Sequence, residues 1–103
     1  MKTYHHFFSK LANQLKIDIL CLLKERDFSV NEMCSNLDVG QSKLSHALAS
    51  LKMCRIVYAK RSGKKVVYSL NKETILPILK TIDKHERVFC KECWARRKND
   101  ISR

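Results

Sequence analysis

The sequence predicts a mainly α fold of the winged helix-turn-helix class. It indicates two short helices joined by a three-residue turn, followed by a β-hairpin and a last helix. The clearest sign is the capping box Ser29-Val30-Asn31-Glu32, in which the Ser29 hydroxyl and the Glu32 carboxylate accept hydrogen bonds from each other's backbone N–H groups. We expect this helix to run to about Leu37. Asp38-Val39-Gly40 predicts the turn, and apolar residues at helical spacing resume after Gln41.

Apolar residues at helical spacing also predict the other helices. Residues 5–25 are expected to form one or two helices, with Phe7, Phe8, Leu11, Leu15, Ile19, Leu22 and Leu23 on the apolar side. The helix from Gln41 has an apolar face of Leu44, Ala47, Leu48 and Leu51. A last helix is expected from Lys72 to about Trp94, with Pro77 in its first two turns, where the missing N–H does least harm.

A change of period marks the wing. Residues 56–60 and 65–70 are rich in β-branched and aromatic side chains and predict two strands, joined through Arg61-Ser62-Gly63-Lys64 with Ser-Gly at the turn. The expected architecture is about five helices with a two-stranded β wing. We assign residues 1–94 to a single winged helix-turn-helix domain with terminal dimerisation helices, and residues 95–103 to a polar C-terminal tail.

The charge balance indicates a polyanionic partner. The chain has 103 residues, with 21 Lys and Arg against 10 Asp and Glu, a formal net charge of +11 and a pI near 9.7. Most of this excess lies after residue 51. A single small core of this size often completes its burial by dimerising, so we expect a homodimer. Without an apolar run of about 18 residues or a signal peptide, we expect a cytoplasmic protein with no membrane partner.

Taken together, these elements resemble the ArsR/SmtB family of small dimeric bacterial and archaeal repressors, over about residues 7–88. The resemblance rests on strings spread along the chain: Phe8-Ser9-Lys10-Leu11-Ala12-Asn13, Ile17-Asp18-Ile19-Leu20-Cys21-Leu22-Leu23, Ser29-Val30-Asn31-Glu32-Met33, Gln41-Ser42-Lys43-Leu44-Ser45-His46-Ala47-Leu48 and Val67-Tyr68-Ser69-Leu70. It implies a repressor whose second helix of the helix-turn-helix reads an operator in double-stranded DNA.

The physics of DNA recognition points to two groups of residues. A helix fits the major groove, and short polar side chains on its exposed face reach base edges; we expect Gln41, Ser42, Lys43, Ser45 and His46 to do so. Residues 52–65 hold six cations and no acid, and the cations of the hairpin are expected to contact phosphates: Lys60, Arg61, Lys64 and Lys65. The alternatives are a solvated basic face, or a module that binds protein or RNA without an effector.

Catalysis is not expected. A cysteine nucleophile would need His46 or His85 as its base, but the sequence offers neither histidine a third orienting residue or an oxyanion loop. We therefore expect no enzyme activity, no small-molecule substrate and no required cofactor.

The cysteines are the candidate sensors of a soft metal, such as zinc, or of a thiol-reactive signal. The family resemblance implies a metal box around Cys34, but Asn36 stands at its second cysteine position, and only His5 and His6 could complete it. The family's zinc site on the last helix is missing, because Lys72, Thr74 and Val88 replace its ligands and only His85 remains. A shared site built from His85, Cys90 and Cys93 across a dimer is the remaining metal hypothesis.

A dithiol switch is the competing hypothesis. Cys21 resembles the first thiol of the persulfide- and redox-sensing members, and Cys90 follows about one helical turn later than their second. Cys90 and Cys93 could also pair with each other, since flanking cations favour thiolates. Cys21 can equally be a buried core thiol, and Cys54 is assigned to the core.

Overall fold

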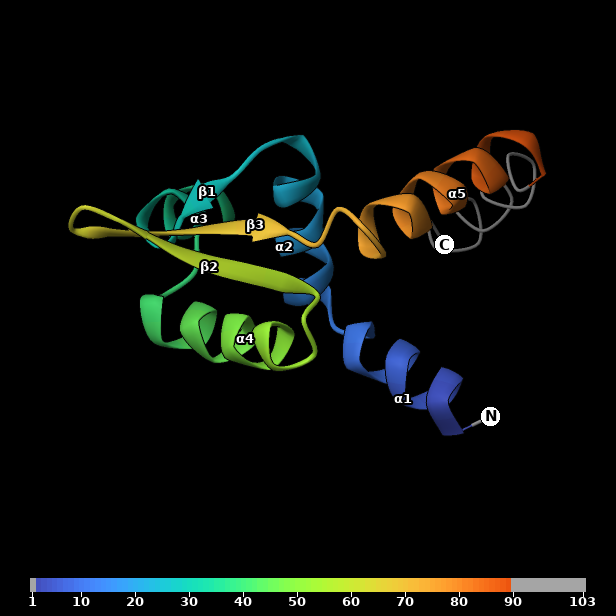
Figure 1. Cartoon of the computed structure of the whole chain (residues 1–103), viewed down its shortest axis with the longest axis horizontal. Helices are drawn as coiled ribbons and strands as arrows, with labels where there is room; N and C mark the ends of the chain where they lie inside the picture. Colours follow the sequence, from blue (N-terminus) through green and yellow to red (C-terminus); the bar gives the residue numbers. More distant parts are fainter. Residues whose placement is uncertain (1, 90–103) are drawn as a thin grey trace, which may run out of the picture. The chain divides into compact units, whose positions relative to one another are not determined.

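The structure is a computed structural model that describes residues 2–89 (Figure 1). The chain divides after Asn71 into two compact units, which are described separately. The first unit contains α1 (Lys2–Leu11), α2 (Gln14–Glu25), α3 (Val30–Leu37) and α4 (Gln41–Met53), together with a small sheet. The expected stretch of one or two helices over residues 5–25 is therefore two helices, separated at Ala12 and Asn13, and the Asn13 side chain caps the second by accepting from the Lys16 N–H at 3.1 Å.

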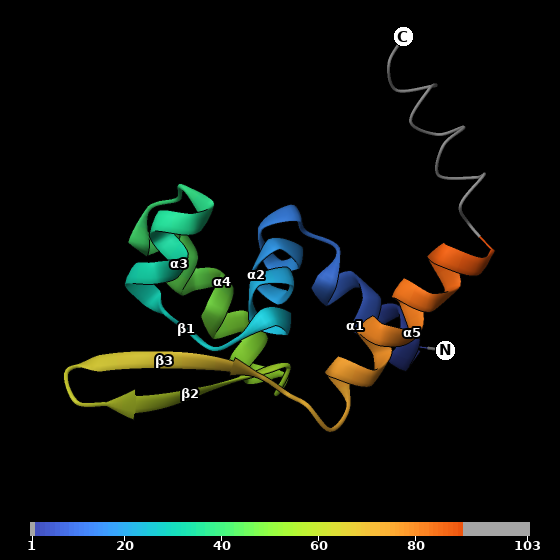
Figure 2. The same ribbon diagram turned by 90° about the horizontal axis from the view of Figure 1, so that it is seen from above.

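The core of this unit lies between α2, α3, α4 and the sheet. Its fully buried side chains come from all of these elements: Ile19, Leu20, Met33, Leu44, Leu48, Leu51, Ile56 and Val57. Figure 2 shows the three helices on the same side of the hairpin. Lys16 adds a polar tie between α2 and α4, because its Nζ donates to Ser50 Oγ at 3.0 Å and to the carbonyl of Lys10 at 3.2 Å.

The predicted hairpin is present and belongs to a sheet of three strands. β1 (Phe28–Ser29), β2 (Val57–Ser62) and β3 (Lys65–Leu70) form an antiparallel sheet in the order β1-β3-β2. The short β1 was not expected; it pairs with β3 in the register Phe28↔Tyr68 and Ser29↔Val67. Because α3 begins directly after β1, this pairing brings the first turn of α3 beside the wing.

The wing turn is tighter than the sequence suggested. Ser62 pairs with Lys65, so the loop has two residues, Gly63 and Lys64, and Ser62 belongs to the strand. Gly63 has φ +64° and Lys64 does not have a positive φ, which is the pattern of a type II′ turn. Such a turn matches the twist of the two strands, so it holds the basic tip of the hairpin in a defined shape.

The junction between α4 and β2 is held by Asn71. Arg55 adopts a left-handed conformation with φ 57°, which turns the chain from the helix into the strand. The Asn71 amide donates to the Arg55 carbonyl at 2.8 Å, and its backbone N–H donates to the Ile56 carbonyl at 3.0 Å. Asn71, directly after β3, therefore holds the junction where α4 ends and the wing begins.

The second unit is described by α5 (Ile75–Val88). The expected start at Lys72 is wrong by three residues, because residues 72–74 form a turn and Thr74 is the N-cap. Pro77 lies in the first turn, as expected, where its missing N–H leaves no intrahelical bond unmade. Ile75 is buried, whereas Ile82 and Val88 are more than half exposed. The predicted tail, residues 95–103, lies outside the described residues, and the single-domain assignment of residues 1–94 stays a prediction.

No helix within residues 2–89 combines the length and the apolar character that a membrane span requires.

Candidate nucleic-acid interface

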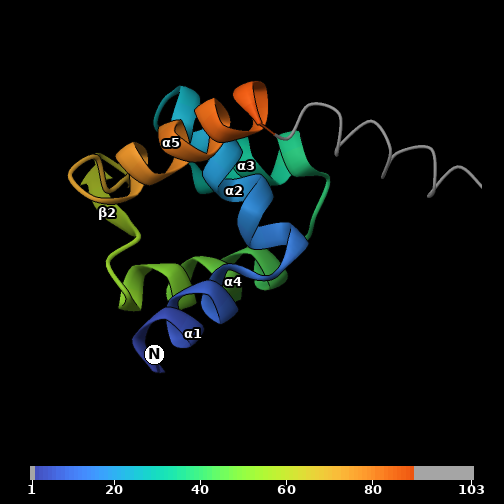
Figure 3. The same cartoon turned by 90° about the vertical axis from the view of Figure 1, so that its right-hand side faces the viewer.

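The helix-turn-helix is built as the sequence predicts. Ser29 caps α3: its Oγ accepts from the Glu32 N–H at 3.2 Å, and Glu32 Oε1 accepts from the Ser29 N–H at 2.9 Å. This backbone hydrogen bond and the nearby Arg26 guanidinium lower the pKa of Glu32, so the carboxylate stays charged and the cap stays closed. Asp38, in the left-handed conformation, ends α3, and α4 begins three residues later, at Gln41; Figure 3 shows the short connection between the two helices.

The recognition helix α4 divides into a buried and an exposed face. Leu44, Ala47, Leu48 and Leu51 are buried, which confirms the predicted apolar face. The five predicted base readers are all exposed on the other sides of the helix: Gln41, Ser42, Lys43, Ser45 and His46. Gly40 is the N-cap and supplies no side-chain acceptor, so no capping side chain covers the N–H groups of the first turn.

The hairpin presents cations on both of its faces. The register places Arg61 opposite Val66, on the same face as the buried pair Val57 and Leu70. Lys60, Lys64 and Lys65 are also exposed. The four predicted phosphate contacts therefore lie around the tip of one hairpin.

The segment that carries these cations contains no acidic residue. Residues 39–72 contain eight Lys and Arg and no Asp or Glu. Within residues 2–89, the structure pairs none of Lys43, Lys60, Arg61, Lys64 and Lys65 with an acid. Uncompensated cations on a helix and a wing of one unit form an electrostatic surface suited to a phosphate backbone.

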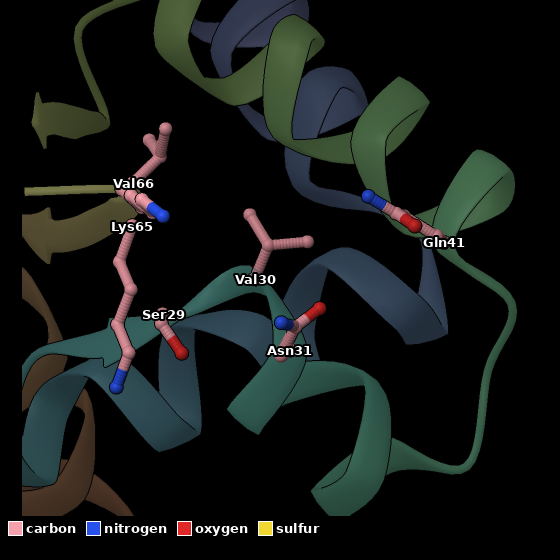
Figure 4. A pocket seen from close by; sticks show the side chains of 7 residues that line it. Ser29, Val30, Asn31, Gln41, Lys65 and Val66 are labelled. Carbon is pink, nitrogen blue, oxygen red and sulfur yellow. The ribbon is translucent and has the colours of Figure 1, made fainter.

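A pocket of about 190 Å³ lies where α3, α4 and the wing meet (Figure 4). Its lining comes from the start of α3, from the first residue of α4 and from the hairpin: Ser29, Val30, Asn31, Gln41, Lys64, Lys65 and Val66. Ser29, Val30, Asn31 and Val66 were not among the predicted site residues. The β1 pairing that brings them together involves two residues, which is too short to leave a periodic signal in the sequence.

The cysteines are spread over separate elements. Cys21 on α2 is exposed, so it is not a core thiol, and Cys34 on α3 is half-buried. The assignment of Cys54 to the core is wrong: it is the exposed C-cap of α4, placed where the left-handed Arg55 turns the chain away from the buried face. Cys90 and Cys93 lie outside the described residues.

The residues present do not fit the family's metal box around Cys34. The Asn36 amide donates to the Glu32 carbonyl at 2.8 Å and is used within the helix. Nowhere in residues 2–89 do three or more His, Cys, Asp or Glu side chains come together as a metal site. His5 and His6 are exposed on α1, and the His85 ring on α5 lies 5.2 Å from that of Phe89.

Comparison with known proteins connects this geometry to transcription. Residues 9–59 match the family described as "Bacterial regulatory protein, arsR family". The chain is 30% identical over 80 residues to the transcriptional activator HlyU of Vibrio cholerae, which is 78% of this chain and 71% of that protein. It is 43% identical over 75 residues to the HTH-type transcriptional regulator Rv0081 of Mycobacterium tuberculosis, 71% of this chain and 65% of that one.

The solved structures of these two relatives share the fold. The crystal structure of Rv0081 superposes with a TM-score of 0.75 over 99% of this chain and 95% of that chain, at 32% identity. HlyU from Vibrio cholerae superposes with a TM-score of 0.70 over 82% and 88% of the two chains, at 28% identity. The chain is also 29% identical over 80 residues to a biofilm growth-associated repressor of Agrobacterium fabrum, 78% of this chain and 66% of that protein.

Proposed function

Because this chain belongs to the ArsR family of bacterial regulatory proteins, we propose that it is a homodimeric transcriptional repressor that binds a pseudo-palindromic operator. It is a DNA-binding transcriptional regulator of the winged helix-turn-helix type and not an enzyme. The proposed site of action is the cytoplasm, where the DNA is.

One observation carries the proposal. The exposed face of α4 and the tip of the hairpin belong to the same compact unit and hold uncompensated cations, with no acid between residues 39 and 72. In this arrangement α4 enters the major groove and the wing contacts the backbone or the adjacent minor groove. We propose Gln41, Ser42, Lys43, Ser45 and His46 as the base readers, and Lys60, Arg61, Lys64 and Lys65 as the phosphate contacts.

The apolar surfaces of the terminal helices support a dimer. α1 buries no residue within its unit, and Tyr4 and Phe8 are 64% and 60% exposed. Ile82 and Val88 on α5 are 54% and 57% exposed, and Phe89, the C-cap of α5, is 74% exposed. One small core leaves these apolar helix faces exposed to solvent. A second copy of the chain that packs on them would cover them. We propose that both helices take part in that interface.

Selection from a random duplex library tests this function. We expect an inverted repeat whose half-sites are about one helical turn, or about 10 bp, apart, because a two-fold dimer places two recognition helices at that spacing. The selected duplex should bind at least about a thousandfold more tightly than random DNA at physiological salt. Enrichment of no sequence, or tighter binding to single-stranded RNA, would contradict a role as an operator-binding repressor.

A signal that releases the operator is proposed to act on thiols. The candidates are a soft metal such as zinc held by His85, Cys90 and Cys93, or a disulfide formed within the set Cys21, Cys90 and Cys93. Cys21 is exposed on α2 and can react. Cations near Cys90 and Cys93 in the sequence favour the thiolate that either chemistry needs.

Replacing Cys90 and Cys93 together by Ser is expected to leave operator binding intact and to abolish release. The reason is that both the metal and the oxidant act on thiolates that the variant lacks. Release is measured by fluorescence anisotropy with zinc, cadmium, arsenite, diamide and a polysulfide in parallel. The matched control, Cys54→Ser, should respond like the wild type; a full response of the double variant would show that these two thiols are not the sensor.

A further inference from the structure

The pocket between α3, α4 and the wing lies where a DNA strand must pass. A helix in the major groove and a wing at the adjacent minor groove are separated by one sugar-phosphate strand. Gln41, the first residue of α4, and Lys64, in the wing turn, both line the pocket. The pocket therefore lies between the two DNA-contacting elements of the proposed function, on which this inference rests.

The polar side chains that line the pocket can all donate hydrogen bonds. Figure 4 shows the Asn31 amide coming from α3, the Gln41 amide from α4 and the Lys65 side chain from the wing. Within residues 2–89 neither amide has a hydrogen-bond partner, and no Asp or Glu is among the lining residues. The Ser29 hydroxyl accepts from the Glu32 N–H and still has its own proton to donate.

The first turn of α4 adds positive electrostatic potential to the pocket. Gln41, at the start of α4, lines the pocket, and Gly40 provides no capping side chain. The backbone N–H groups of a helix start carry a partial positive charge that favours an anion. Val30 and Val66 give the same pocket an apolar side.

We propose that this pocket binds one phosphate of the DNA backbone together with part of its sugar, and that Asn31 is the α3 residue that positions it. The volume of about 190 Å³ equals that of roughly six liquid waters, which is room for a phosphate and an adjoining sugar edge. The two amides can donate to the oxygens of a phosphodiester, and Lys64 and Lys65, which also line the pocket, add positive charge beside it. Val30 and Val66 match the apolar edge of the sugar. The contact sets the register of α4 on the duplex and reads no base.

Asn31→Asp tests the proposal, with Asn36→Asp as the matched control. Both changes add one negative charge to an exposed position of α3, so the change in net charge is the same. Asn31→Asp is expected to weaken binding to operator and random DNA alike by about tenfold or more relative to Asn36→Asp, because it replaces a donor to phosphate by a repelling carboxylate.

Thermal unfolding separates this effect from a folding defect. A carboxylate at residue 31 lies in the first turn of α3 and favours the helix, whereas one at residue 36 lies in the last turn and loses the bond to the Glu32 carbonyl. Asn31→Asp should therefore be the more stable variant and the weaker DNA binder. If both variants bind DNA equally, the pocket does not bind phosphate.

Methylphosphonate substitution locates the phosphate. Each phosphate of the selected half-site is replaced in turn by a neutral methylphosphonate, and the affinities of the wild type and Asn31→Ala are compared. At one position per half-site, we expect the methylphosphonate to lower the affinity of the wild type several-fold and the affinity of Asn31→Ala hardly at all. The reason is that the neutral phosphonate and the Asn31→Ala change remove the same contact. If each methylphosphonate lowers the affinity of the wild type and of Asn31→Ala equally, the proposal is wrong. The proposed function would still hold in that case, provided that the wild type binds the selected operator.

Discussion

Replacing Leu79 and Ile82 together by Glu is expected to yield a monomer that binds the operator at least about a thousandfold more weakly, because one half-site alone offers too few contacts. Both residues lie on the apolar side of α5; Ile82 is 54% exposed and Leu79 is half-buried. Charges there would be desolvated at an apolar interface, which is unfavourable. Analytical ultracentrifugation reports the assembly state, and fluorescence anisotropy reports the affinity.

Lys80→Gln with Lys84→Gln is the matched control for this variant. It lowers the net charge by the same two units on the same helix, at exposed polar positions. The control should remain a dimer and bind the operator with little change. If the Leu79 and Ile82 variant is also a dimer, the interface does not involve this face of α5.

Removing two cations of the wing, by Arg61→Ala with Lys64→Ala, is expected to weaken binding to operator and random DNA to the same extent. Each phosphate contact contributes about 0.9 to the slope of log affinity against log salt, so the slope should fall by about two units, with a loss of roughly 10- to 30-fold near 0.15 M salt. Titrations at four salt concentrations measure both quantities. The Lys80 and Lys84 variant again controls for net charge.

The same titrations distinguish phosphate contacts from base readers. Lys43→Ala and His46→Ala should reduce the preference for operator over random DNA by about 1–3 kcal/mol per lost base contact, with a smaller change in the random-DNA affinity. If the wing variant instead loses operator binding while its affinity for random DNA stays the same, the wing reads sequence.

Local patterns in the sequence were sufficient for most of the fold. The capping box at Ser29, the apolar spacing of α4 and the hairpin after residue 56 were all predicted, and the structure confirms them. Each depends on groups a few residues apart, so the information lies within one helical turn or one strand pair. The acid-free basic segment is likewise a property of composition, which is why a polyanionic partner could be predicted before any geometry.

What the tertiary structure decided involves groups far apart in the chain. β1 has only two residues and no pattern of its own; it is a strand because β3, about forty residues later, offers it a free edge. Cys54 is exposed next to the left-handed Arg55, where the chain turns, and the distant Asn71 holds the Arg55 carbonyl. Asn31 lines the same pocket as wing residues because β1, which directly precedes α3, pairs with β3. The sequence by itself thus determined the class of protein and its charged surface. Long-range strand pairing decided the shape of that surface, because the energy of such pairing depends on contacts between residues far apart in the chain, which no local pattern records.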